Sequence, residues 1–176
     1  LAVSVGTSGA VRQVVSHLHV DDQARTWSYR LDLHRHLAGG AINNAGLLIE
    51  WVKRLCYADQ PSQQAFDRLL EDAQQAPAGA DGLICLPYLT GERSPLWQAE
   101  LKGSLHGLTP AQQRGHVSRA ALEAVAYALA EVAEALPPTP MQQAVRVTGG
   151  LARSEVWLQI LADVFNRPVE VVEAQD

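Results

Sequence analysis

The feature that most constrains this chain is a corner near its end, where the strand-like residues 145–147 run into Thr148 and the adjacent glycines Gly149 and Gly150. Apolar residues then recur at helical spacing from Val156, so the pattern predicts a strand, a tight turn and a helix. Glycine adopts positive φ and has no Cβ, so a flat or anionic ligand can approach the backbone beside the free N–H groups of a helix start. A nucleotide is the first candidate. A corner that needs glycine only for steric reasons is the alternative.

A second glycine turn lies at the other end of the chain. Residues 2–5 and 11–15 have extended patterns and flank Gly6, Thr7, Ser8 and Gly9, which predicts a β-hairpin. Two glycines and two hydroxyl side chains also suit a phosphate cradle built from backbone N–H groups. A plain polar turn is equally compatible with the loop taken alone. Residues 26–33 predict a third antiparallel strand.

The middle of the chain predicts helices separated by loops. Residues 39–46 are rich in glycine and lead into a helix over 47–55, for which Asn43 or Asn44 is the expected cap. A second helix is expected over 62–75, and a short strand over 82–86. The loop over 87–107 is long enough to suggest a function, and its Glu92 and Arg93 are expected to pair with each other rather than with a ligand.

The last third predicts a long core helix and the elements around the glycine corner. Thr109, Pro110 and Gln112 form a favourable helix start, with threonine as the cap and proline in the first turn. That helix is expected to end at Pro137, before the strand over 145–147, and a final edge strand is expected over 169–172. The order of elements predicts an α/β fold with a mixed central sheet and helices on both faces. This layout resembles the ribonuclease-H-like ATPase domain of the actin, hexokinase and sugar-kinase group.

Composition and charge exclude several classes of function. The chain has 176 residues, a net charge of −5 and 14 scattered basic residues, so no basic stripe predicts binding to nucleic acid or a membrane. No run of about 18 apolar residues predicts a membrane span, and no signal segment is visible. Cys56 and Cys85 lack metal-ligand spacing and suggest free thiols in a reducing cytoplasm. Two histidine pairs, at 17 and 19 and at 34 and 36, could face a metal, but solvated edge histidines are favoured because no third ligand is suggested nearby.

Four motifs, in order, resemble the C-terminal domain of the FGGY carbohydrate kinases over nearly the whole chain. They are residues 5–10 (VGTSGA), 39–51, 86–97 (LPYLTGERSPLW) and 148–154 (TGGLARS) with the helix that follows. Among members of the family, the motifs look most similar to gluconate kinases, and xylulose kinases share much of the pattern.

The resemblance implies an ATP- and Mg²⁺-dependent kinase that phosphorylates a sugar acid or a sugar, and it also implies roles for individual residues. Gly6, Thr7, Ser8 and Gly9 would face the ATP phosphates. Gly46 and Glu50 would lie along the nucleotide, and Gly149, Gly150 and Ser154 would contact the adenosine. Glu50 is the departure from the pattern, because a carboxylate repels phosphates, and a solvated helix residue is the alternative.

The same resemblance implies that residues 1–176 are one domain of a longer protein. The catalytic aspartate is expected upstream of Leu1, and an N-terminal sugar-binding domain and a last C-terminal segment are expected outside this stretch. No catalytic and no metal-binding residue is therefore expected here, and the chain alone is predicted to be inactive. A homodimer is compatible with this reading. A nucleotide-binding module without kinase activity is the rival from another functional class.

Overall fold

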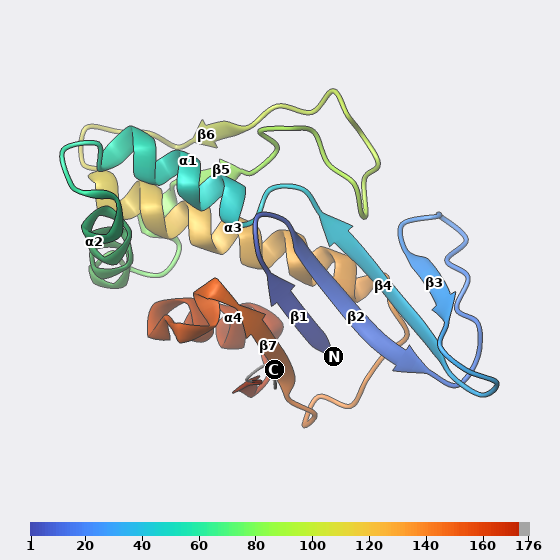
Figure 1. Ribbon diagram of the computed structural model, residues 1–176. Coiled ribbons are helices and arrows are strands. Elements are labelled where there is room, and N and C mark those ends of the chain that lie inside the picture. The colour runs from blue at the N-terminus through green and yellow to red at the C-terminus, as the bar shows by residue number, and fades with distance from the viewer. Residues whose placement is uncertain (173–176) are drawn as a thin grey trace.

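The computed structural model describes residues 1–172, which form a six-stranded mixed sheet packed against helices (Figure 1). The strand order is β3-β4-β2-β1-β7-β8. Neighbouring strands from β3 to β1 are antiparallel, and β1, β7 and β8 are parallel. The strands are β1 (Ala2–Val5), β2 (Gly9–Val15), β3 (Trp27–Arg30), β4 (His36–Ile42), β7 (Val145–Gly149) and β8 (Val169–Val171).

Four helices and a small second sheet complete the fold. The helices are α1 (Gly46–Cys56), α2 (Ser62–Gln75), α3 (Arg114–Glu134) and α4 (Glu155–Phe165). Short 3₁₀ turns cover Ala80–Gly82 and Gly150–Arg153, and β5 (Ile84–Leu86) pairs with β6 (Ser104–His106). Helix α3 is buried along most of its length and contacts β2, β4 and the other three helices. Its many alanines permit this close packing.

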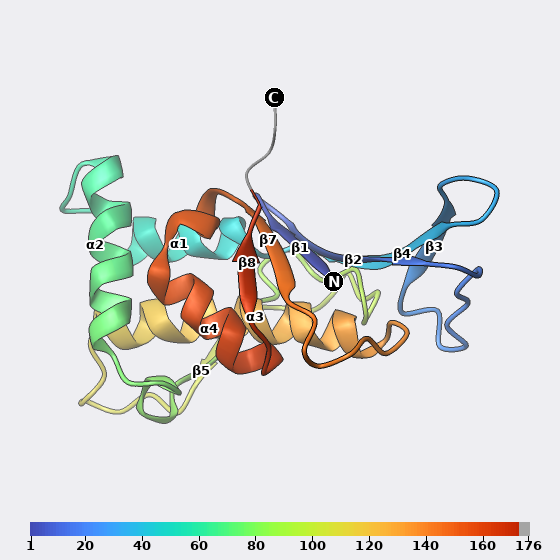
Figure 2. The same cartoon turned by 90° about the horizontal axis from the view of Figure 1, so that it is seen from below.

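The core lies between one face of the sheet and helices α3 and α4. Side chains alternate along a strand, so Val3, Val11 and Val147 point into this core and are almost fully buried. Ser4 and Arg146 belong to the opposite face and are partly or fully exposed. Figure 2 shows both helices on the same side of the sheet. The mixed sheet of an α/β fold is thus confirmed, and within residues 1–172 α3 and α4 cover one of its two faces.

The segment before α1 differs from the sequence prediction. Residues 39–42 belong to a strand, β4, and the predicted third strand pairs with β4 rather than with the hairpin. A Cβ on Gly39 would lie 2.7 Å from the Trp27 ring and 2.6 Å from the Val11 carbonyl oxygen. Glycine is therefore needed here because neighbours occupy the space of a side chain.

Two helix starts also differ from the prediction. Ala45, and neither Asn43 nor Asn44, is the N-cap residue of α1, and no side chain of residues 1–172 caps this helix. Helix α3 begins at Arg114, after a separate turn in which the Thr109 hydroxyl donates to Gln112 Oε1 at 2.7 Å. Gln113 and His116 form the capping box instead. Helix α2, strand β7 and edge strand β8 are confirmed, and α4 follows the Gly150–Arg153 turn as a helix after the glycine corner.

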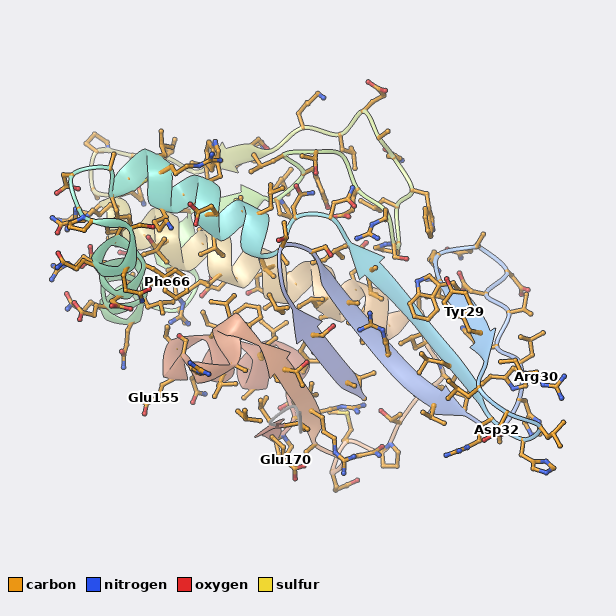
Figure 3. All side chains as sticks on the ribbon, in the orientation of Figure 1. Tyr29, Arg30, Asp32, Phe66, Glu155 and Glu170 are labelled. Carbon is orange, nitrogen blue, oxygen red and sulfur yellow. The ribbon has the colours of Figure 1, made fainter. Side chains whose placement is uncertain are left out.

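Residues 16–35 form an arm at one end of the sheet, in which β3 is the edge strand. Tyr29 and Arg30 on β3, and Asp32 in the turn to β4, lie at one end of the molecule, far from Phe66 on α2 and Glu155 on α4 (Figure 3). The Trp27 and Tyr29 rings pack with their centroids 4.7 Å apart. The four histidines expected on edge segments are on or beside this arm, and His19 Nε2 lies 3.1 Å from the Ala135 carbonyl oxygen. No group of three metal-binding side chains occurs in residues 1–172.

Candidate functional site

The two glycine turns lie side by side because β1 is a central strand. Val5, the last residue of β1, pairs with Gly9 of β2 on one side and with Gly149 of β7 on the other. Neighbouring strands are about 4.8 Å apart, so the two glycines flank Val5 at a separation of about 10 Å. Ile42, at the end of β4, is opposite Gly9 and extends this row. Turns from opposite ends of the sequence thus share one edge of the sheet (Figure 1).

The start of helix α1 contacts the hairpin loop through two backbone hydrogen bonds. Gly46 N–H donates to the Gly6 carbonyl at 2.9 Å, and Leu47 N–H donates to the Thr7 carbonyl at 3.0 Å. A Cβ on Gly46 would lie 2.4 Å from the Gly6 oxygen, so only glycine permits this approach. The contacts fix the loop carbonyls toward the helix, while Gly6, Thr7 and Ser8 remain exposed on the outside. Gly9 is buried at the start of β2.

The two glycines of the corner have different environments. Gly149 has a φ of 109°, and a Cβ on it would lie 2.0 Å from the Val5 carbonyl oxygen, so the fold itself requires glycine there. Gly150 is exposed, and a Cβ on it would meet no atom of residues 1–172 within 4 Å. Open space over Gly150 is what a ligand lying against the backbone needs. The sequence could not distinguish these two positions.

Two of the predicted site residues, Ser154 and Glu50, already have partners within the protein. Ser154 is 9% exposed, and its hydroxyl accepts a 3.4 Å hydrogen bond from Trp157 N–H as the cap of α4. Glu50 is an exposed residue one turn into α1, where its carboxylate pairs with Lys53 Nζ at 2.6 Å. The pairing partly neutralises the carboxylate. The fold brings the glycines of the two turns and Gly46 to one edge of the sheet, whereas the Ser154 hydroxyl caps α4.

A polar network beside this edge was missed by the sequence reasoning. The expected Glu92–Arg93 pair is wrong, since no ion pair joins these side chains in the described part of the chain. Glu92 Oε1 instead accepts the backbone N–H groups of Asn43 at 2.5 Å and Arg93 at 2.8 Å. The Arg93 guanidinium donates to Asn43 Oδ1 at 2.6 Å and to the Ile42 carbonyl at 3.1 Å. The sequence signals were the polar pair Asn43–Asn44 before the α1 helix and the long loop that contains Glu92 and Arg93.

Burial controls the electrostatics of this region. Glu92 is 4% exposed, and loss of solvent raises the pKa of its carboxyl, although the N–H groups of Asn43 and Arg93 oppose the shift. Burial likewise raises the pKa of the Cys85 thiol to about 11, which keeps it protonated.

The loop Gly6–Gly9 contains no Lys or Arg. An anion bound there would be met by N–H groups, hydroxyls and any cation that accompanies it.

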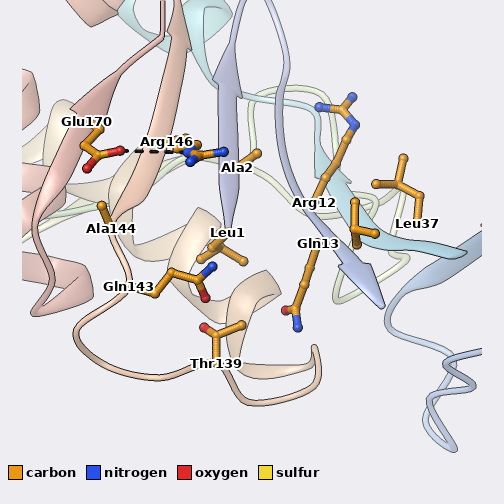
Figure 4. A pocket seen from close by; sticks show the side chains of 11 residues that line it. Leu1, Ala2, Arg12, Gln13, Leu37, Thr139, Gln143, Ala144, Arg146 and Glu170 are labelled. Carbon is orange, nitrogen blue, oxygen red and sulfur yellow. Dashed lines mark ion pairs between the residues drawn. The ribbon is translucent and has the colours of Figure 1, made fainter. Parts of the chain in front are cut away.

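A hollow of about 520 Å³ lies at the other end of the strands (Figure 4). Leu1, Arg12, Gln13, Thr139, Arg146 and Glu170 are among its lining residues, and Arg146 and Glu170 approach within 3.8 Å. Leu1 precedes β1 whereas Val5 ends it, so this hollow is separate from the glycine edge. None of the predicted site residues lines it.

The C-terminal domain of the FGGY family of carbohydrate kinases matches residues 1–176. The chain belongs to this family. The resemblance inferred from the glycine motifs and the loop over 86–97 is therefore confirmed, as is the sugar-kinase type of fold. No helix in residues 1–172 of this FGGY chain has the length and apolarity that crossing a membrane requires.

Relatives of this FGGY domain include kinases for different sugars. Gluconokinase of Bacillus subtilis (strain 168) is 38% identical over 184 residues, which cover 100% of this chain and 36% of the relative. Gluconate kinase from Lactobacillus acidophilus is 37% identical with a TM-score of 0.88, covering 99% of this chain and 35% of that one. Ligand-bound xylulose kinase from the same organism has the same identity and coverage and a TM-score of 0.89. The FGGY chain thus spans about a third of the length of these relatives.

Proposed function

We propose that this chain is the ATP-binding part of a carbohydrate kinase that transfers the γ-phosphoryl group of ATP to a hydroxyl of gluconate. The observation that carries the proposal is the pairing of Val5 with both Gly9 and Gly149, which places two glycine turns at one sheet edge. The 38% identity to a gluconokinase over the whole chain supports gluconate as the acceptor.

The proposed roles follow from exposure and geometry. The exposed Gly6–Ser8 loop, with Gly9 at its base, would bind the phosphates through N–H and hydroxyl groups, which suits phosphoryl transfer because it depends mainly on positioning and charge stabilisation. Gly46 would hold that loop, and Glu50 would lie along the nucleotide. The open backbone at Gly150, after Gly149, would accept the adenosine, with Ser154 ordering the helix beside it.

Other parts of the reaction are assigned outside this stretch. We propose that Mg²⁺ arrives with the ATP phosphates, because Glu50 is the only carboxylate among the proposed site residues and already pairs with Lys53. The catalytic base and most contacts to the sugar acid are proposed to belong to the rest of the protein, so residues 1–176 alone should not turn over. The two free thiols support a cytoplasmic location.

Xylulose is the second candidate acceptor, since xylulose kinase from L. acidophilus matches the fold as well as gluconate kinase does. The full-length protein should be assayed for ADP release with gluconate and with xylulose at matched concentrations. A kcat/KM that is higher for gluconate supports the proposal, and a higher value for xylulose replaces it with the alternative. Nucleotide binding without turnover on either acceptor would favour a binding module.

A further inference from the structure

Asn44 is a buried amide that joins two distant segments of the chain. It is 0% exposed, and its Nδ2 donates to the Gly91 carbonyl at 2.8 Å. Its Oδ1 accepts hydrogen bonds from the Thr90 N–H and the Thr90 hydroxyl, each at 3.1 Å. These three contacts tie the loop at residues 90–91 to the residue before Ala45, the N-cap of α1. A buried amide is tolerated only with such partners.

Glu92 fastens the same loop at a second point. Its Oε1 accepts the Asn43 and Arg93 N–H groups, and its Oε2 is buried with no hydrogen-bond partner among residues 1–172. Burying a carboxylate with one oxygen unpaired is energetically unfavourable, and an apolar side chain would stabilise a loop at lower cost. The burial of Glu92 is therefore better explained by the position that it gives to the loop at residues 90–93 than by stability alone.

The brace formed by Asn44, Thr90 and Glu92 is connected directly to the hairpin loop. Two residues after Asn44, Gly46 donates to the Gly6 carbonyl, and Leu47 donates to the Thr7 carbonyl. The two backbones are in close contact, because a Cβ at Gly46 would lie only 2.4 Å from the Gly6 oxygen. A small displacement of the start of α1 must therefore move Gly6 and Thr7.

We propose that Asn44 and Glu92 are positioning residues for the nucleotide phosphates, because they lock loop 90–93 onto the start of α1 and α1 sets the hairpin loop. The proposal rests on the proposed function, in which Gly6–Ser8 binds phosphate. Neither residue contacts the nucleotide itself. Their loss should weaken nucleotide binding while leaving contacts to the acceptor unchanged.

The test compares N44A and E92A in the full-length protein with the control Y57F. Tyr57 is also fully buried, directly after α1, and its hydroxyl bonds Ser118 Oγ at 2.9 Å at the far end of that helix. For N44A and E92A, we expect the Kd of MgADP and the KM of MgATP to rise about tenfold, with KM for gluconate changed less than about twofold. Y57F should lower the melting temperature while leaving these nucleotide constants unchanged.

Conservative variants separate positioning from general destabilisation. E92Q keeps an acceptor at Oε1 and should bind MgADP within about twofold of the wild type. T90V removes one contact of Asn44 at an exposed residue and should raise the Kd of MgADP by about threefold. If N44A does not fold, T90V decides the outcome.

Two results would overturn the inference while the wild type binds MgADP normally. One is nucleotide constants for N44A, or for T90V where N44A does not fold, that match those of Y57F. The other is E92Q as impaired as E92A, because the carboxylate charge and not its hydrogen bonds would then matter. Absence of MgADP binding by the wild-type protein would instead refute the proposed function.

Discussion

At the scale of single residues, Gly149 and Gly150 have different tasks despite being adjacent. Gly149 has positive φ, and a Cβ on it would overlap the Val5 carbonyl oxygen at 2.0 Å, whereas a Cβ on Gly150 would project into open space. We predict that G149A lowers the free energy of unfolding by about 3 kcal/mol or more, since strain and overpacking add. G150A should change it by less than about 1 kcal/mol.

The same pair of variants tests the site. G150A should fold normally yet weaken MgADP binding, because its methyl group occupies the space where the adenosine is proposed to lie. Urea denaturation and calorimetric binding measure the two effects separately. Equal MgADP affinity for G150A and the wild type would remove Gly150 from the proposed site.

Glu92 leads to a prediction about pH. Because burial raises the pKa of its carboxyl above the ordinary 4.5, the folded protein holds a proton that the unfolded chain has already lost between the two pKa values. The free energy of unfolding attributable to Glu92 therefore falls as pH rises through that window. Urea denaturation from about pH 4 to 8 should show this decline in the wild type and its absence in E92Q. Parallel pH profiles would show that Glu92 does not contribute it.

Residue-level prediction from sequence succeeded where conformation is local. The hairpin around Gly6–Gly9 follows from turn chemistry, and the glycine pair at the strand-to-helix corner indicates positive φ there, although not that Gly149 alone adopts it. The partners of Asn44 could not be predicted, since its hydrogen bonds reach 46 and 47 residues along the chain. Nor could the pairing of Glu50 with Lys53 be distinguished from a role at the nucleotide.

At the scale of elements, glycine misled the prediction of β4. The glycine-rich stretch before α1 does not indicate a strand, because glycine is depleted in strands, but here glycine makes room for neighbours. A Cβ on Gly40 would lie 2.7 Å from both Ser94 Oγ and Val132 Cγ1. Only the packing of a distant loop and α3 reveals why a strand contains two glycines. Helix α2, whose apolar spacing is regular, needed no such information.

The start of α3 gives a prediction that separates two candidate caps. Gln113 forms the capping box with His116, while Thr109 only orders an exposed turn with Gln112. H116A, which removes the acceptor of the Gln113 N–H, should therefore lower the free energy of unfolding by about 1 kcal/mol, and T109A by less than about 0.5 kcal/mol. Urea denaturation at constant m-value checks both. The reverse ranking would mean that the helix begins at the threonine, as its sequence suggests.

At the scale of the whole molecule, the site depends on strand order. Residues near 5, 9 and 149 meet because β1 lies between β2 and β7, and no local pattern encodes a parallel pairing across more than 140 residues. Resemblance to a known family supplied that information at the sequence level. The brace formed by Asn44, Thr90 and Glu92 could not be predicted in this way, because its side-chain hydrogen bonds join segments that lie 46 and 47 residues apart.

The proposed nucleotide edge lies wholly within this chain, which leads to a final prediction for residues 1–176 alone. It should bind MgADP without turning over ATP, since its turns lie on one sheet while the proposed base lies elsewhere. At 100 times its Kd, the ligand should add about 2.7 kcal/mol to the free energy of unfolding. For a chain of this size, that raises the melting temperature by roughly 5–10 °C.

Mg²⁺ alone should give no such rise, because the proposed site residues include only one carboxylate, which is already paired. Gluconate-dependent ADP release by residues 1–176 would show instead that the chain contains its own base.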